Sequence, residues 1–227
     1  MEKYTIHAIW LGKNIPPLPL ICINDWKKQG YFSKLWLEND PKIKSWIKNC
    51  EFARECHKRK LYAFVTDYLR LKILQEYGGL YLDTDVTIEK NPFELFENID
   101  FAVGYENDNN QIGTAVIYSI KGSKMINDLV SFYENEIMSS SEFLGPKIMT
   151  NILNSTSNNN IEIFPTSFFY PYKGDKSLFN TPKETYLIHW FQHSWKKPKH
   201  EYFLKSKHLG IIGTLYQWQK LKLRFKK

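Results

Sequence analysis

Two carboxylates, Asp83 and Asp85, flank Thr84 near the end of an apolar stretch and are the residues best suited to chemistry. Leu80–Ile88 reads as one strand, whose two-residue repeat sends both carboxylates to the same side. Paired like charges beside a buried strand are costly unless a cation or hydrogen bonds stabilise them. Hard divalent ions take carboxylates together with phosphate oxygens. The pair therefore predicts a divalent metal that bridges a diphosphate, with Asp85 as its ligand and Asp83 contacting metal-bound water or a ribose.

A second charged pair lies on the helix predicted over residues 60–77, which Gly78-Gly79 end. Asp67 and Arg70 are three residues apart and so share one helical face. Taken alone they fit a local ion pair as well as a site. Together with two acids at the end of the following strand, they predict one polar pocket in which Arg70 holds a phosphate or sugar hydroxyls.

The elements that must position these residues alternate between strand and helix through the first half of the chain, and the second half is more mixed. Alternation of this kind predicts an α/β fold with a mainly parallel central sheet flanked by helices. Residues 1–195 contain no clear linker, so we expect a single domain there. The strands are predicted at 4–10, 32–37, 80–88, 101–105, 115–120, 161–164 and 184–190.

The charge of the chain is unevenly distributed. The whole sequence has 31 basic and 24 acidic residues and a net charge of +7. Residues 196–227 hold ten basic residues and one acidic residue, Glu201, a net charge of +9, which leaves 21 basic against 23 acidic residues in 1–195. The basicity thus belongs to a C-terminal extension over 196–227, and such a tail suggests nucleic acid, an anionic membrane or an acidic partner.

Residues 208–227 can be interpreted in two ways. As a helix, Ile211, Leu215, Trp218, Leu221 and Phe225 fall on one side, and Lys220, Arg224 and Lys227 fall on the other, although Lys222 interrupts the apolar side. A basic amphipathic helix of this kind can lie in an anionic membrane interface. The strict alternation of residues 221–226 instead favours a strand that packs on the core.

Other features indicate an intracellular protein. Cys22, Cys50 and Cys56 are odd in number and form no C-x-x-C pair, so neither a disulfide framework nor a zinc site is indicated. The first residues do not resemble a signal peptide, and no apolar run approaches the roughly 20 residues that span a bilayer. We therefore expect a cytoplasmic location. The basic tail is also compatible with peripheral attachment at the inner face of the cell membrane.

The acid pair and its surroundings resemble a known signature. Asp67-Tyr68-Leu69-Arg70, followed by Gly78-Gly79-Leu80-Tyr81-Leu82-Asp83-Thr84-Asp85, is similar to the core of the DXD sugar transferases grouped as glycosyltransferase family 32. That family includes transferases of bacterial capsular polysaccharide and fungal outer-chain mannosyltransferases, and the catalytic domains of glucosylating toxins share its core. Weaker similarities extend the resemblance over about residues 4–195.

The resemblance implies a GT-A fold, a retaining transfer from a nucleotide sugar, and a divalent cation, Mn²⁺ or Mg²⁺. It implies that Asp67, Arg70, Asp83 and Asp85 act at the donor sugar and its leaving group. Asp83, Asp85 and His189 would hold the metal. The donor would contact residues from both ends of the domain, namely Ile9, Trp10, Tyr81, Asp83, Ser194 and Trp195. On the acceptor side the resemblance implicates Gly113, Thr114, Gly145 and Pro146.

The partners implied are a UDP- or GDP-sugar and a saccharide or lipid-linked oligosaccharide acceptor, in the synthesis of a bacterial surface polysaccharide such as capsule or lipopolysaccharide. The resemblance leaves the bond formed and any protein nucleophile unspecified. His7 and His193 have no assigned role, because a single histidine near a strand is more often a core residue than a ligand.

Two alternatives come from other classes. Asp83-Thr84-Asp85-Val86-Thr87 satisfies the D-x-D-x-[TV] pattern of phosphatases with an aspartyl nucleophile, in which Asp83 would attack phosphorus and Asp85 would act as the acid. That pattern usually opens a chain, and no convincing later acid pair follows. The tail alone would suit a non-catalytic module that binds nucleic acid or membrane, but residues 1–195 carry no basic signal, so nucleic acid is not expected.

Overall fold

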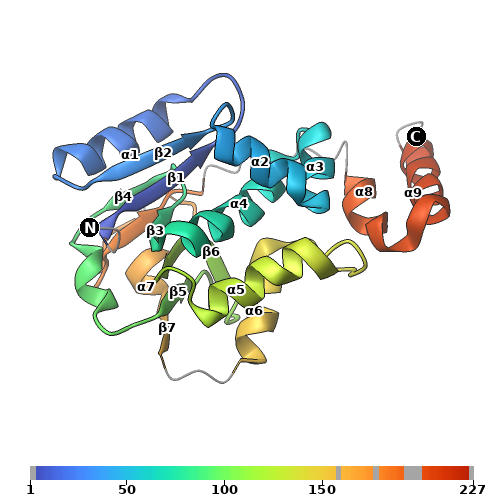
Figure 1. The fold of residues 1–227 in the computed structure, drawn as a ribbon. Coiled ribbons are helices and arrows are strands. Elements are labelled where there is room, and N and C mark those ends of the chain that lie inside the picture. Colours follow the sequence, from blue (N-terminus) through green and yellow to red (C-terminus); the bar gives the residue numbers. More distant parts are fainter. Residues whose placement is uncertain (1–3, 157–159, 176–178, 192–200, 225–227) are drawn as a thin grey trace.

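The computed structural model describes residues 4–156, 160–175, 179–191 and 201–224 of the 227-residue chain. A six-stranded sheet forms its centre, with the strand order β2-β1-β3-β6-β5-β7 (Figure 1). β1 pairs in parallel with β2 and β3, and β5 pairs in parallel with β7. β6 is antiparallel to both of its neighbours, β3 and β5. The prediction of a mainly parallel α/β sheet is therefore confirmed.

The strands have the usual lengths for a protein of this size. The central sheet consists of β1 (Ile6–Trp10), β2 (Ser33–Leu37), β3 (Gly79–Leu82), β5 (Phe101–Tyr105), β6 (Ile112–Ser119) and β7 (Ile161–Phe164). A second sheet has two antiparallel strands, β4 (Val86–Ile88) and β8 (Leu187–His189).

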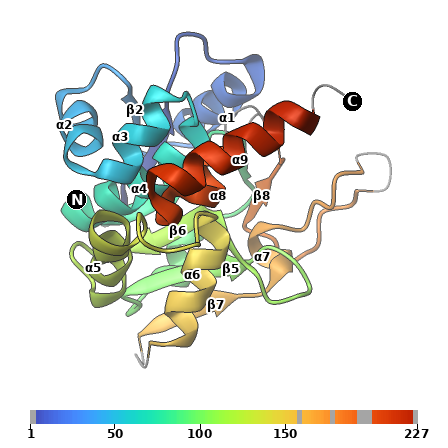
Figure 2. The same cartoon turned by 90° about the vertical axis from the view of Figure 1, so that its right-hand side faces the viewer.

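Helices cover both faces of the central sheet (Figure 2). Five of them build the core on one face, namely α2 (Pro41–Asn49), α3 (Glu51–Lys58), α4 (Tyr62–Tyr77), α5 (Lys124–Ser131) and α6 (Gly145–Asn154). The core on the other face takes its side chains from α1 (Pro17–Lys28), the 3₁₀ turn η2 (Pro92–Phe96), α7 (Thr166–Phe169) and the small sheet. The chain then ends with α8 (Glu201–Ser206), the 3₁₀ turn η5 (Lys207–Leu209) and α9 (Gly210–Arg224).

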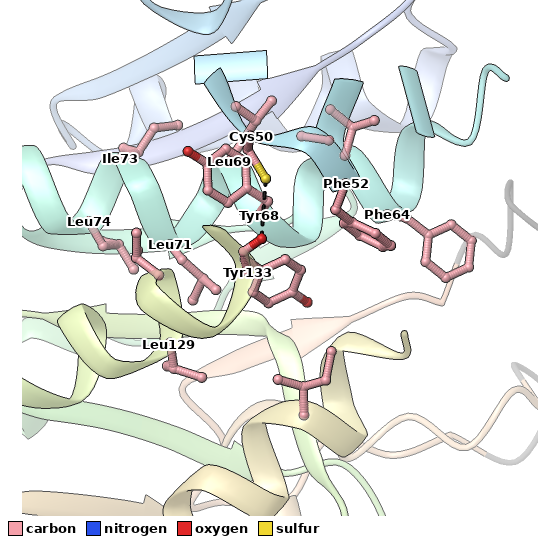
Figure 3. Close-up of a cluster of buried hydrophobic side chains, with 14 of the residues drawn as sticks. Cys50, Phe52, Phe64, Tyr68, Leu69, Leu71, Ile73, Leu74, Leu129 and Tyr133 are labelled. Atoms are coloured by element: carbon pink, nitrogen blue, oxygen red, sulfur yellow. Dashed lines mark hydrogen bonds between the residues drawn. The ribbon is translucent and has the colours of Figure 1, made fainter. Parts of the chain in front are cut away.

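α4 is the central helix of the larger core. It is buried on most sides, as the apolar residues around its whole circumference require. Figure 3 shows α4 side chains such as Leu71 facing Leu129 of α5 and Tyr133 of the π-helical turn η3 (Phe132–Glu136). The Cys50 thiol donates a hydrogen bond to the backbone oxygen of Tyr133. This packing fixes the helix that carries Asp67 and Arg70.

The single strand predicted over residues 80–88 is wrong. The chain leaves the central sheet after Leu82, turns through Asp83, Thr84 and Asp85, and continues as β4 in the second sheet. The Asp83 amide donates to the Ala115 oxygen at 2.8 Å, and the Val86 amide donates back to the Asp83 oxygen at 3.2 Å. The two carboxylates are therefore brought together by a turn rather than by the pleat of a strand.

The C-terminal extension has two different parts. Phe203 and Leu204 of α8 are buried in the larger core, and the Arg59 guanidinium lies 4.1 Å from the centre of the Phe203 ring. Buried Lys207 donates to the backbone oxygens of Ile137 and Ser140. α9 lies beyond α8 on the outside of the molecule (Figure 1). It is helical through Arg224, so the alternative of a strand beginning at residue 221 is wrong.

Candidate active site

Arg70 is the centre of the site and is buried. Its Nη2 atom lies 3.1 Å from Asp67 Oδ1, and its Nη1 atom lies 3.4 Å from Asp83 Oδ1. Its guanidinium also donates to the backbone oxygens of Thr66 and Thr114. Helix α4 and the turn after β3 are thus held together by one cation. The predicted convergence of both charged pairs is present in the structure.

Tyr81 contacts both Arg70 and Asp83 of this network from the buried side. Its ring centre lies 4.8 Å from the Arg70 guanidinium carbon, and its hydroxyl donates to Asp83 Oδ1 at 2.7 Å. The Tyr81 side chain is only 2% exposed, whereas the Asp83 side chain is 29% exposed. Tyr81 therefore orients the Asp83 carboxylate from the buried side, and the carboxylate is the member of the network that is open to a ligand.

Asp83, Asp85 and His189 form a cluster with the composition of a metal site. One ligand atom of each lies within 4.8 Å of the others. His189 Nε2 is 3.4 Å from Asp85 Oδ1. Among the described residues, His189 Nδ1 is buried without a hydrogen-bond partner. Two carboxylates and an imidazole suit Mn²⁺ or a similar divalent ion, and an unpaired buried nitrogen beside them is the polar atom such an ion would satisfy. The three residues therefore fit a divalent cation.

The small sheet explains how His189 reaches an acid pair 104 positions earlier in the chain. Val86 of β4 lies opposite His189 of β8, and the Trp190 amide donates to the Asp85 oxygen at 3.0 Å. Trp26 Nε1 donates to the Val86 oxygen at 2.9 Å and fixes β4 from the side of α1. The Tyr170 ring packs edge-on against His189, with ring centres 5.8 Å apart.

The electrostatics of the site differ from one group to the next. Burial raises the pKa of Asp67 to about 6, and the nearby Arg70 only partly opposes this shift. Burial alone would lower the pKa of His189, but the Asp85 hydrogen bond and the charges of Asp85, Asp83 and Glu106 raise it above its usual value. The site thus attracts positive charge, which is the requirement for holding a cation.

The four residues predicted on the acceptor side lie near the network but contribute in different ways. The Thr114 oxygen accepts from Arg70, and Gly145 is so close to Asp67 that a Cβ atom there would lie 2.7 Å from the Asp67 carboxylate. A Cβ atom on Gly113 would lie 2.3 Å from the Tyr170 ring. The Pro146 oxygen accepts from Thr150. Gly113 and Gly145 therefore permit close packing around the site.

Not all of the residues that were predicted to contact the donor lie beside the cluster of Asp83, Asp85 and His189. Trp10 is half-buried at the end of β1, and its Nε1 has no hydrogen-bond partner among the described residues. The Ile9 side chain is buried in the larger core. Ser194 and Trp195 lie outside the described residues, as does His193.

Two residues near the site were missed by sequence reasoning. Glu106 follows β5, and its half-buried carboxylate interacts electrostatically with Asp83 and His189; burial raises its pKa. Tyr170 is fully buried, and its hydroxyl accepts from the Val116 amide at 3.1 Å. No local motif marks either residue. Only the position of Glu106 at the end of a predicted strand could have drawn attention to it.

Comparison with known proteins identifies this arrangement. Residues 16–104, which include both charged pairs, match the family model described as "Glycosyltransferase sugar-binding region containing DXD motif". Over these residues, which are less than half of the chain, the sequence matches the DXD glycosyltransferases. The acid pair Asp83 and Asp85 lies within the matched residues, and the predicted resemblance to DXD sugar transferases is confirmed at this level.

Two curated proteins are similar over longer stretches. "Subversion of eukaryotic traffic protein A" of Legionella pneumophila is 26% identical over 166 residues, which cover 61% of this chain but only 26% of that protein. The chain thus matches about a quarter of that relative's length. "Uncharacterized glycosyltransferase L373" of Acanthamoeba polyphaga mimivirus is 25% identical over 214 residues and is covered to 82%.

Solved structures support the fold of the glycosyltransferase domain. "PaToxG Glycosyltransferase" has a TM-score of 0.51 and 22% identity, with 67% of this chain and 69% of that chain covered. A glycosyltransferase involved in the glycosylation of the major capsid of PBCV-1 has a TM-score of 0.53 and 13% identity, with 82% and 92% covered. The predicted GT-A type of fold is therefore confirmed.

Proposed function

We propose that this glycosyltransferase domain transfers a hexose from UDP- or GDP-sugar to a saccharide acceptor with retention of configuration, and that it requires Mn²⁺ or Mg²⁺. The observation that carries the metal requirement is the cluster of Asp83, Asp85 and His189 beside the Arg70 network. Retention is supported by the resemblance of the signature to retaining transferases. The phosphatase alternative has no such support from the matched family.

Within the proposal, Asp83, Asp85 and His189 hold the cation. A divalent ion bound there would neutralise the negative charge that develops on the departing diphosphate. Asp83 is the most open of the charged groups, so its second oxygen remains available to a ligand while Tyr81 and Arg70 fix the first. No protein nucleophile is assigned, because the proposed retaining step needs none beside the leaving phosphate.

The geometry changes the role expected for Arg70. Each nitrogen of its guanidinium already has a protein acceptor, in Thr66, Thr114, Asp67 or Asp83. Its positive charge is therefore used to hold Asp67 and Asp83 in place, and we propose that it is a positioning residue. The Asp67 carboxylate, 13% exposed, is the better candidate for a direct contact with the donor sugar.

The acceptor proposed is an oligosaccharide attached to a lipid, as in the assembly of a bacterial surface polysaccharide. Gly113, Thr114, Gly145 and Pro146 are the residues assigned to its side of the site, and Ser194 and Trp195 to closure over the diphosphate. A lipid-linked acceptor would be reached at a membrane.

The experiment is a panel of UDP- and GDP-sugars incubated with the full chain, with Mn²⁺ or with EDTA. We expect release of one nucleoside diphosphate in Mn²⁺ and almost none in EDTA. Asp85→Asn should abolish release, and Asp128→Asn, an exposed carboxylate paired with Lys124 on α5, should not change it. The anomeric configuration of the transferred sugar, read by NMR, tests retention. Inversion, or equal turnover in EDTA, would refute the corresponding part of the proposal.

A further inference from the structure

Helix α9 carries a large apolar surface that the rest of the described chain does not cover. Ile211 is 80% exposed, Ile212 84%, Leu215 55% and Tyr216 62%. These residues belong to adjacent turns of a single helix, and Leu209 just before it is 50% exposed. Exposed aliphatic side chains concentrated in this way mark an interaction surface, whereas single exposed apolar residues do not.

The base of this helix is firmly attached to the glycosyltransferase domain. Phe203 and Leu204 are buried in the core, and Lys207 is bound by the oxygens of Ile137 and Ser140. α9 itself packs against α8 and η5. Figures 1 and 2 agree that α9 is the outermost element on its side. The helix is therefore presented by a rigid base rather than by a loose linker.

The positive charge of the segment that contains α9 indicates which kind of partner its apolar surface binds. Residues 210–227 contain five basic residues and no acidic residue. A second copy of the chain would have to bring two such segments together, and like charges oppose that pairing. A nucleic acid would satisfy the charge but would leave Ile211 and Ile212 in water. An anionic lipid surface satisfies both features, since apolar side chains enter the interface while basic residues meet the headgroups.

The turn η5, which directly precedes α9, is attached to a segment that leads to the site. Lys207 binds the segment at residues 137–140, and that segment leads directly to Gly145, which contacts Asp67. A membrane bound by α9 would thus be connected to the site through η5 and the segment over residues 137–145.

We propose that α9 is an interfacial helix that binds the glycosyltransferase domain to an anionic lipid membrane through Ile211, Ile212, Leu215 and Tyr216. The binding surface is independent of the D-x-D cluster; only its purpose, access to a lipid-linked acceptor, rests on the proposed function.

The test is co-sedimentation of the full chain with vesicles of phosphatidylcholine alone and of phosphatidylcholine with phosphatidylglycerol, without nucleotide or metal. We expect binding to the anionic vesicles that weakens as salt is raised. The double variant Ile211→Glu/Ile212→Glu should weaken partitioning by about ten-fold or more, because both side chains leave the interface. Ile21→Glu, at an apolar residue of α1 that is 62% exposed, is the matched control and should bind like the wild type.

Three results would overturn the proposal. The first is that the wild type does not bind anionic vesicles. The second is that the Ile211→Glu/Ile212→Glu variant binds them as well as the wild type and has the same melting temperature. The third is that light scattering shows a dimer of the wild type and a monomer of this variant, while neither protein binds vesicles. The last result would assign the surface to a second copy of the chain. Asp85→Asn should bind vesicles normally, so failure of the proposed catalysis and failure of membrane binding are observed separately.

Discussion

Two buried histidines, His7 and His189, show how the same residue type is used for structure and for function. His7 Nε2 is 3.0 Å from the Gly78 oxygen, and His7 Nδ1 accepts from Trp36 Nε1 at 3.3 Å. These two partners assign the proton to Nε2 and leave the ring neutral. His189 has a carboxylate at one nitrogen and, among the described residues, no partner at the other.

The difference is also electrostatic. Burial, helped by the Lys34 charge and partly opposed by the Gly78 hydrogen bond, lowers the pKa of His7 to about 4. Burial acts in the same direction on His189, but the charges of Asp85, Asp83 and Glu106 outweigh it and raise the pKa. A histidine whose polar atoms are all satisfied and neutral stabilises the fold. A histidine that is left incomplete among carboxylates has the features expected of a ligand.

The largest expected effect concerns the acid pair. Asp85→Asn removes a metal ligand without changing side-chain size, and we expect kcat/KM to fall by about 10³-fold, comparable to the loss of a principal electrostatic group. The thermal unfolding midpoint without metal should not fall, since one of two adjacent like charges is removed. A variant that keeps its activity would contradict the assignment.

The second prediction concerns the pH dependence of stability and comes from His7. Its pKa is lower in the folded chain than in the unfolded chain, so the unfolded state binds the proton more readily between pH 6.5 and about 4. Its contribution is complete above pH 6.5 and is lost as the pH falls toward 4, by roughly 3 kcal/mol in total. Urea unfolding at a series of pH values measures this loss. His7→Leu should flatten the curve in this window, and an unchanged slope would refute the assignment.

A third prediction concerns metal affinity. His189→Gln removes the imidazole from the cluster but keeps a polar side chain. We expect Mn²⁺ to bind at least about 10- to 100-fold more weakly, because altering only the partners of metal ligands already causes losses in this range. Calorimetric titration of Mn²⁺ in the presence of the accepted nucleoside diphosphate measures the change. His7→Leu is the control and should bind Mn²⁺ like the wild type. An equal loss of Mn²⁺ affinity in both variants would contradict the distinction between the two histidines.

The smallest effect is expected for His7 at neutral pH. His7→Leu leaves the Gly78 oxygen and Trp36 Nε1 without their partner, and the added apolar volume offsets part of the cost, so we expect a loss of about 2 kcal/mol in unfolding free energy. Activity at 25 °C should stay within about two-fold of the wild type. A large loss of activity in a stable protein would mean that His7 is more than a core residue.

The sequence was sufficient to predict those features that depend on local patterns. The helix stop at Gly78-Gly79 and the fold class both follow from such patterns. The break between β3 and β4 could not be predicted, because the apolar residues of β3 and the β-branched residues of β4 are both typical of strands. What separates them is the pairing of β4 with β8, about 100 residues later in the chain.

The sequence was sufficient to predict that the two charged pairs lie together, but not the contacts that join them. The spacing of Asp67 and Arg70 placed them on one face of a helix, and the signature joined them to Asp83 and Asp85. One of the acceptors that hold the Arg70 guanidinium is the Thr114 oxygen, a backbone atom that no sequence pattern marks. The environment of Glu106 likewise depends on long-range packing. Such features require the three-dimensional structure.

The most direct test of the central claim is the thermal unfolding of the full chain with a nucleoside diphosphate, with and without Mn²⁺. If Asp83, Asp85 and His189 hold a cation that bridges the diphosphate, one nucleotide together with Mn²⁺ should raise the melting temperature of the wild type, because ligand binding stabilises the folded state. Neither component alone should match that rise, and Asp85→Asn should show none. An equal rise in Asp85→Asn, or a rise without the metal, would contradict the account.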